Sequence, residues 1–236
     1  MLSRFFKILV CWLMINISHA NPIQVDDYQQ FWLWAGVKPQ PVLKHADVLY
    51  VHQGLVREKN HTARFSPQGI SIPRLKTPNI WLTYRVETLN WPDTLFQQIP
   101  QQIKRWEHSG NHISGVQIDF DANTLKLQQY QVFLKQFRQT LPKQYQLSIT
   151  GLLDWSSNTQ PQQLSALQQV VDEVVIQTYR GKQTIPDYQR YLNRLANFPI
   201  PFKIGIVQQG EFTASPRLEQ SAQFKGYVVF LINPMR

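Results

Sequence analysis

Cysteine is almost absent from this sequence. The 236 residues contain a single cysteine, Cys11, and it lies within the first twenty positions. The rest of the chain therefore has no disulfide, no thiol nucleophile and no thiolate metal site. Its stability must come from an ordinary hydrophobic core.

Several catalytic motifs are also missing. The histidines after position 20 do not form the HExxH pair of a zinc protease, and the sequence has neither a G-x-S-x-G nucleophile elbow nor a P-loop. No apolar run after residue 20 is long enough to predict a membrane-spanning helix. The sequence therefore implies no metal and no organic cofactor.

The first twenty residues have the pattern of a secretory signal peptide. Arg4 and Lys7 form a short basic head, Ile8 to Ile17 is apolar, and small residues precede a cleavage site after Ala20. The apolar stretch is shorter than the roughly twenty residues that a bilayer requires, and an uncleaved anchor is the alternative. We predict a signal peptide over residues 1–20 and a periplasmic or secreted mature protein.

Basic side chains outnumber acidic ones. The chain has 24 Lys and Arg against 15 Asp and Glu, a net charge of +9, and removal of Arg4 and Lys7 with the leader leaves +7. This charge suits loose association with an anionic cell envelope but specifies no partner. We expect no nucleic-acid partner outside the cell. The most basic stretch, Arg57 to Lys76, contains one acid, Glu58, and is interpreted as a solvated loop.

Short apolar runs recur along the chain, and helical patterns separate the later ones. This order predicts a parallel sheet built from crossover units. The expected strands are Phe31–Gly36, Asp47–His52, Asn79–Arg85, Gly115–Asp121, Gln146–Leu152, Glu173–Tyr179, Phe202–Val207 and Tyr227–Ile232. Among the helices, the clearest has apolar residues at spacings of three and four, namely Leu127, Tyr130, Leu134, Phe137 and Leu141.

Eight parallel strands with intervening helices close most naturally into a (β/α)8 TIM-like barrel. We predict one such α/β domain over residues 21–236. It should be slightly trimmed, with short or missing helices after strands one, two and eight. Pro39 and Pro41 interrupt the segment where the first helix would lie, and the basic loop occupies the segment where the second would lie. An open doubly wound sheet is the alternative, but no glycine-rich phosphate turn follows the first strand.

The strand from Gly115 to Asp121 holds the candidate catalytic residues. Side chains alternate along a strand, so Gln117, Asp119 and Asp121 share a face that should point into the barrel. The two aspartates lie roughly 7 Å apart along the strand, and the charge of one raises the pKa of the other. Pairing with an arginine or capping of the next helix is the structural alternative. Two carboxylates are too few for calcium, which takes six to eight oxygen ligands.

Other strand ends supply candidate substrate-binding residues, because the working residues of such barrels project from the carboxyl ends of the strands. A tryptophan there can stack on a sugar, a glutamine and a tyrosine can orient it, and an arginine can offset the acidic pair. These candidates are Trp34, Arg85, Glu87, Asp154, Trp155, Gln177 and Tyr179.

The strand Gly115-Val116-Gln117-Ile118-Asp119-Phe120-Asp121 resembles the D-G-x-D-x-D-x-E signature of chitinase-like glycoside hydrolases. In this resemblance, Asp119 matches the final Asp, which positions the acetamido group of the substrate. Asp121 falls at the position of the catalytic Glu acid, and Gln117 replaces an earlier Asp. The segment Gln177-Thr178-Tyr179 is similar to the one that holds the strand-six tyrosine of that family.

The chain from Phe31 to about Asn233 also resembles a bacterial family of exported proteins classed as a domain of unknown function. A strand ending in D-[YF]-D, an S-I-T-x-L-x-x-W segment and a Q-T-Y segment recur in that family. They correspond here to Asp119–Asp121, Ser148–Trp155 and Gln177–Tyr179. This resemblance implies a TIM barrel but no established activity.

We therefore predict an exported carbohydrate-active barrel, a glycoside hydrolase that acts on an amino-sugar or other envelope polysaccharide. Asp121 would be the general acid, and Asp119 would stabilise the developing positive centre. Two acids on one strand fit substrate-assisted hydrolysis. The alternative is a noncatalytic barrel that binds a glycan or another envelope protein, because the side chain of Asp121 is one methylene shorter than that of Glu.

Overall fold

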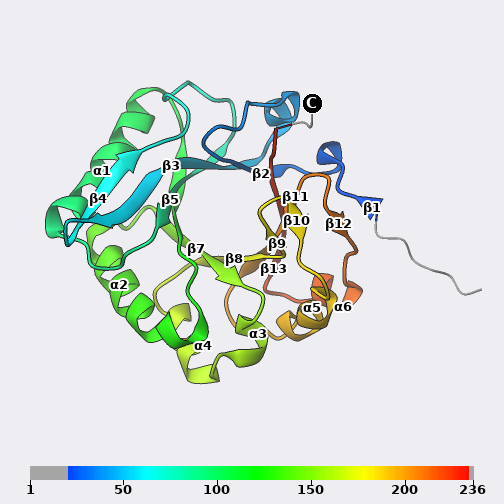
Figure 1. Ribbon diagram of the computed structural model, residues 1–236. Coiled ribbons are helices and arrows are strands. Elements are labelled where there is room, and N and C mark those ends of the chain that lie inside the picture. Colours follow the sequence, from blue (N-terminus) through cyan, green and yellow to red (C-terminus); the bar gives the residue numbers. More distant parts are fainter. Residues whose placement is uncertain (1–20, 234–236) are drawn as a thin grey trace, which may run out of the picture.

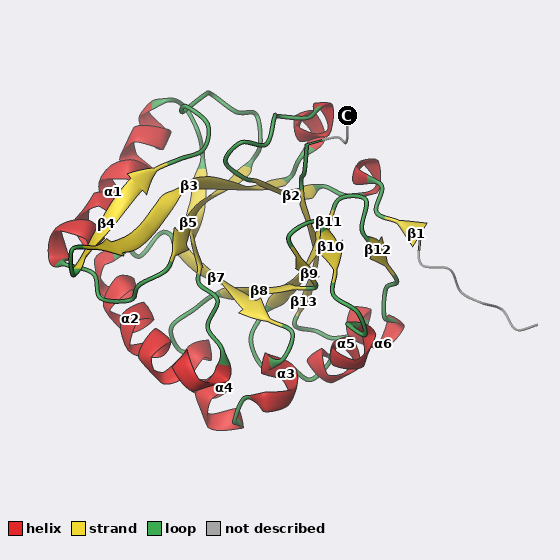
Figure 2. Cartoon of the chain, viewed as in Figure 1, coloured by secondary structure: helices red, strands yellow, loops and turns green. Residues whose placement is uncertain are grey.

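Eight parallel strands form a closed barrel in the computed structural model, which describes residues 21–233 (Figure 2). Parallel pairing of the last strand with the first closes the ring. In order around the barrel, the strands are β2 (Gln30–Leu33), β3 (Val48–Lys59), β5 (Asn79–Val86), β6 (Ile113–Asp119), β7 (Gln146–Leu152), β8 (Glu173–Gln177), β11 (Phe202–Val207) and β13 (Phe224–Phe230). The predicted TIM-like fold is confirmed. The predicted signal peptide, residues 1–20, lies outside the described residues.

Helices surround the barrel from β5 onward, as Figure 1 shows. They are α1 (Asp93–His108), α2 (Leu127–Thr140), α3 (Trp155–Asn158), α4 (Pro161–Gln168), α5 (Gln189–Leu195) and α6 (Pro216–Glu219). The predicted apolar stripe of α2 is buried, with Phe133 added to it. Helix α4 begins with a capping box between Gln160 and Gln163 and has Pro161 in its first turn, an arrangement that favours a helix start. Within residues 21–233, no helix is long and apolar enough to cross a membrane.

The first two connections depart from the repeating pattern. A short 3-10 helix (Pro41–His45) follows β2, and a β-hairpin follows β3. The interpretation of Arg57–Lys76 as a loop is wrong for its first half, because β3 continues to Lys59 and pairs antiparallel with β4 (Thr62–Pro67). Asn60 and His61 form the turn with φ of 52° and 59°, the left-handed geometry that two-residue hairpin turns require.

In the described part of the chain, two pairs of short strands lie outside the main sheet. Strand β1 (Asn21–Pro22) pairs with β12 (Glu211–Phe212), and β9 (Tyr179–Arg180) pairs with β10 (Gln183–Thr184). Two further 3-10 helices cover Val25–Asp27 and Thr124–Lys126, and the side chain of Asn123 accepts a hydrogen bond from the Lys126 amide at the start of the second. The β9–β10 hairpin follows the carboxyl end of β8 directly.

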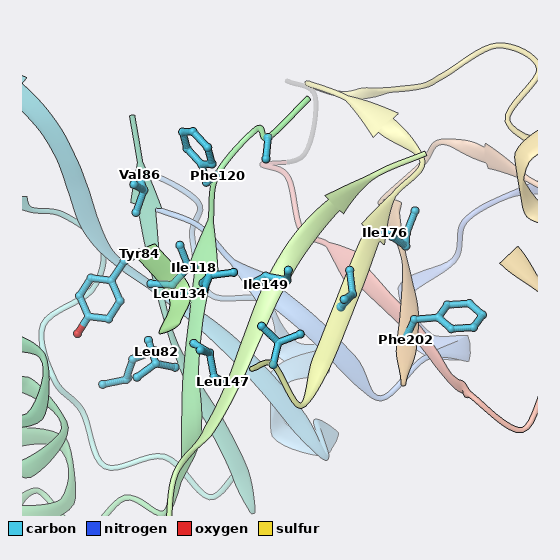
Figure 3. Close-up of a cluster of buried hydrophobic side chains, with 14 of the residues drawn as sticks. Leu82, Tyr84, Val86, Ile118, Phe120, Leu134, Leu147, Ile149, Ile176 and Phe202 are labelled. Atoms are coloured by element: carbon cyan, nitrogen blue, oxygen red, sulfur yellow. The ribbon is translucent and has the colours of Figure 1, made fainter. Parts of the chain in front are cut away.

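The hydrophobic core lies mainly between the strands and the helices. On β6, Val116 and Ile118 face this layer, whereas Gln117 and Asp119 face the barrel interior, and Phe120 just after the strand also packs into the core. Figure 3 shows Ile118, Ile149 of β7 and Leu134 of α2 within this cluster. Because one face of each strand is buried here, the opposite face is left to fill the barrel interior and to form the site.

Candidate functional site

A buried polar network fills the barrel toward the amino ends of the strands. The Lys203 ammonium lies 2.9 Å from one oxygen of Glu173. The other Glu173 oxygen accepts hydrogen bonds from the Tyr50 hydroxyl at 2.6 Å and the Ser148 hydroxyl at 3.0 Å. The amide of Gln117 donates to Ser148 at 3.0 Å and extends the network toward the middle of the barrel. This layer closes the barrel below the site.

The indole of Trp32 covers the network. Its Nε1 donates to the Gln117 Oε1 at 2.6 Å, and the Thr83 hydroxyl donates to the same oxygen at 3.3 Å. Trp32 also contacts Tyr50, with ring centroids 5.7 Å apart. Since Trp32 lines the open space above it as well, it forms part of the floor of the site.

A cavity of about 610 Å³ lies above this floor, at the carboxyl ends of the strands. Its walls combine aromatic rings with a small set of charged and polar groups, the composition typical of ligand sites. The aromatic lining residues are Trp32, Trp34, Tyr179, Tyr191 and Phe230, and the polar ones are Arg85, Asp119, Asp121, Thr150, Asp154, Gln177 and Arg180.

Asp119 is the last residue of β6 and is buried in the cavity wall. One of its oxygens accepts a hydrogen bond from Thr150 at 2.9 Å, and the other accepts one from Arg85 at 2.9 Å. Burial raises the pKa of Asp119 above its usual value, although the nearby Arg85 guanidinium opposes this shift. The protonated form of Asp119 is therefore more accessible than that of an ordinary surface aspartate.

Asp121 follows two residues after Asp119, and half of its side chain is exposed. The Arg85 guanidinium donates to both oxygens of Asp121, with Nη1 3.3 Å from Oδ1. Arg85 comes from the neighbouring strand β5, where it pairs in register with Asp119. The guanidinium therefore bridges the two carboxylates. Pairing with an arginine is the structural alternative to a catalytic role for these two aspartates.

Contacts between aromatic rings hold Trp34 and Tyr179 in place in the cavity wall. Trp34 stacks on His52 with ring centroids 4.1 Å apart and an angle of 6° between the planes. Tyr179 packs against Phe230 at 5.2 Å and against Trp32 at 6.4 Å. Burial lowers the pKa of His52 to about 4, so this ring is neutral near neutral pH and supports Trp34 as an aromatic partner.

The cavity brings together seven of the nine residues that the sequence marked as candidates. These are Trp34, Arg85, Asp119, Asp121, Asp154, Gln177 and Tyr179. Glu87 is exposed beyond the end of β5 and does not line the cavity. Trp155 is fully buried and donates its indole N–H to the Ala122 carbonyl at 2.9 Å, because α3 turns it into the core. Among the described residues, no group of three His, Cys, Asp or Glu side chains is placed to hold a metal ion.

Sequence reasoning missed several lining residues, including Trp32, Thr150, Arg180, Tyr191 and Phe230. Trp32 and Trp34 are two residues apart and so share a face, and this signal was available for Trp32. Thr150 lies two residues after Ser148 on β7, so both side chains are on the face of the strand that points into the barrel. Arg180 and Tyr191 reach the cavity from the β9–β10 hairpin and from α5, and no strand pattern indicates this.

A closed barrel of eight parallel strands with a polar and aromatic cavity at their carboxyl ends places this chain in the TIM-barrel class. Within the chain, residues 78–184 match the model of a family described as a domain of unknown function (DUF3142). This segment contains the D-F-D, S-I-T and Q-T-Y motifs, and over these residues the match confirms the resemblance to a family classed as a domain of unknown function. No curated protein sequence matches the chain at a significant level.

Two solved structures with TM-scores of 0.50 and 0.57 share this fold. The xylanase and alpha-amylase inhibitor protein XAIP-II from Scadoxus multiflorus has 10% identity and a TM-score of 0.57, with 86% of this chain and 92% of that chain covered. Concanavalin B has 10% identity and a TM-score of 0.50, with 88% and 94% covered. The spore cortex-lytic enzyme SleL of Bacillus cereus has 14% identity and a TM-score of 0.49, with 75% of this chain covered. This chain spans about half of SleL, 49% of its length.

Proposed function

We propose that the cavity binds a saccharide and that Asp119 and Asp121 hydrolyse a glycosidic bond in it. One observation carries the proposal: two carboxylates at the end of one strand and the ring of Trp34 line the same cavity. Paired carboxylates support an oxocarbenium-like transition state, and an aromatic face packs against the apolar face of a sugar. The resemblance of the Asp119 strand to chitinase-like hydrolases supports an amino-sugar or other envelope polysaccharide as the substrate.

The proposed reaction is substrate-assisted. Asp121 gives a proton to the glycosidic oxygen as its bond to the anomeric carbon breaks, and the acetamido carbonyl oxygen of the substrate bonds to that carbon. Asp119 stabilises the positive charge that develops on the acetamido group. Water then adds to the anomeric carbon, the acetamido group is restored and a proton returns to Asp121, so that one water is consumed for each bond broken. In this scheme Gln177 and Tyr179 orient the sugar.

A noncatalytic binder of a glycan or of another envelope protein is the second candidate. The contact of Arg85 with both aspartates favours it, because an adjacent cation stabilises ionised carboxylates. A general acid must carry a proton, so hydrolysis requires the substrate to displace the guanidinium from Asp121. The shorter reach of aspartate compared with glutamate favours the same candidate.

Export to the periplasm or to the medium is part of the proposal. The leader pattern of residues 1–20 supports export, and the net charge of +7 that remains without the leader supports loose association with an anionic envelope. Release of the protein from intact cells by osmotic shock is the expected result for a periplasmic protein. Recovery in the cytoplasmic fraction with an uncleaved leader would contradict it.

The experiment that tests the function is reducing-end release from amino-sugar and envelope polysaccharides. It compares the native protein with Asp121→Asn and with Glu87→Gln, which removes a carboxylate outside the cavity. If the protein is a hydrolase, we expect the native protein and Glu87→Gln to release reducing ends and Asp121→Asn to release none. Release that persists in Asp121→Asn would refute the mechanism. Calorimetric binding without release, weakened by Trp34→Ala but not by Asp121→Asn, would establish the binder.

A further inference from the structure

The β3–β4 hairpin carries a cationic face that the proposed mechanism does not use. In the strand pairing, Arg57 lies opposite Arg64, and Lys59 lies opposite Thr62. Because side chains alternate across a strand, Arg57, Lys59 and Arg64 share one face of the hairpin. Glu58, the only acid of this segment, lies on the opposite face. All three cations are exposed.

This cationic face lies beyond the carboxyl end of the barrel, on the side of β3 that faces the barrel interior. Leu55 on β3 pairs in register with Arg85 on β5, which lines the cavity, so both lie on the face directed to the barrel interior. Arg57 follows two residues later on the same face, roughly 7 Å further along the strand. On the other face of the hairpin, Phe65 packs on Tyr84 with ring centroids 5.8 Å apart. Figure 1 shows the hairpin leaving the ring beside α1.

The charges on this face have no ion-pair partner among the residues that the structure describes. Like charges directly opposite each other destabilise a strand pair, and Arg57 and Arg64 occupy such positions. Of residues 21–233, none places a carboxylate within ion-pair distance of Arg57, Lys59 or Arg64. An anionic group bound between the two arginines would remove the repulsion and accept hydrogen bonds from both guanidinium groups.

We infer that this face binds acidic groups of the same polysaccharide whose sugar occupies the cavity. The inference rests on the proposed function and narrows its substrate class to a polysaccharide that carries carboxylate or phosphate groups. Arg180, which is exposed and lines the cavity from the β9–β10 hairpin, adds a cation elsewhere on the wall of the cavity. The basic hairpin thus selects the polymer, and the cavity holds the sugar at which hydrolysis occurs.

The test measures calorimetric affinity for three probes: hyaluronan, which carries carboxylates; a poly(glycerol phosphate) teichoic acid; and a neutral N-acetylglucosamine hexamer. The native protein is compared with Arg57→Gln/Arg64→Gln. The matched control, Lys135→Gln/Arg217→Gln, removes two exposed cations from α2 and α6. We expect the hairpin variant to lose about tenfold or more in affinity for one acidic probe, whereas the control should change by less than about twofold. The acidic probe that is affected identifies the carboxylate or the phosphate.

The melting temperature shows whether the hairpin variant is folded. Removing the cross-strand repulsion should leave this temperature unchanged or raise it. Added salt should weaken binding of the acidic probe more than binding of the neutral one. Equal affinity for acidic and neutral probes, or an acidic-probe affinity unchanged in the hairpin variant, overturns this inference and leaves the proposed function standing. Failure of the native protein to bind or cleave any saccharide overturns both.

Discussion

Replacing Lys203 by methionine should strongly destabilise the barrel. Lys203 and Glu173 are 7% and 8% exposed, and their charged groups lie 2.9 Å apart inside the barrel. Methionine preserves most of the side-chain volume but leaves the Glu173 carboxylate with hydroxyl donors alone, those of Tyr50 and Ser148. Breaking a buried pair in this way costs about 3–5 kcal/mol. For a domain of this size, that loss lowers the melting temperature by roughly 6–20 °C.

Urea and thermal unfolding monitored by circular dichroism measure this loss. Lys135→Met, at an exposed position on α2, is the matched control and should stay within about 0.5 kcal/mol of the native protein. The double variant Glu173→Leu/Lys203→Met should be more stable than Lys203→Met, because no charge is left buried without a partner. A loss below about 1 kcal/mol in Lys203→Met, or additive losses in the double variant, would refute the reasoning.

Three further changes test other parts of the structure. Burial lowers the pKa of His52 from 6.5 to about 4. As the pH falls, the imidazole of His52 is therefore protonated in the unfolded chain before it is protonated in the folded protein. The stability of the native protein relative to His52→Phe should therefore fall between pH 6.5 and 4 in urea melts, and a constant difference would contradict this. The Tyr84 hydroxyl is buried without a hydrogen-bond partner among the described residues, so Tyr84→Phe should gain about 1 kcal/mol, and a loss of stability would oppose this reading. Trp155→Ala should cost about 3–5 kcal/mol by leaving a core cavity, yet the folded protein should retain its saccharide affinity, measured by calorimetry; reduced affinity would place Trp155 in the site.

The barrel could be predicted because buried parallel strands are continuous apolar runs. The observed bounds of β7 and β11, Gln146–Leu152 and Phe202–Val207, equal the expected ones. The β3–β4 hairpin escaped prediction, since charged residues separate Val56, Ala63 and Phe65 and the segment has the composition of a loop. Only pairing with a neighbouring strand shows that these three residues share the face packed toward α1 and β5.

The site was only partly predictable for a related reason. Asp119 and Asp121 end an alternating strand, so their position at the carboxyl end of the barrel followed from the pattern. The sequence also predicts that Arg85 offsets the acidic pair. That one guanidinium bridges both carboxylates depends on the register between β5 and β6, which the sequence does not encode locally. Trp155 lies just beyond a strand end, where a residue turns either into the cavity or under the next helix, and short helix α3 places it in the core.

The most direct test of the central claim is calorimetric titration of the native protein and Trp34→Ala with oligosaccharides prepared from amino-sugar and envelope polysaccharides. The account predicts that at least one oligosaccharide binds the native protein. It also predicts that Trp34→Ala weakens this binding about tenfold or more while the protein stays folded, because the ring lines the cavity. Binding that is unchanged in Trp34→Ala, or no binding of any oligosaccharide, would contradict the assignment of this cavity as a saccharide site.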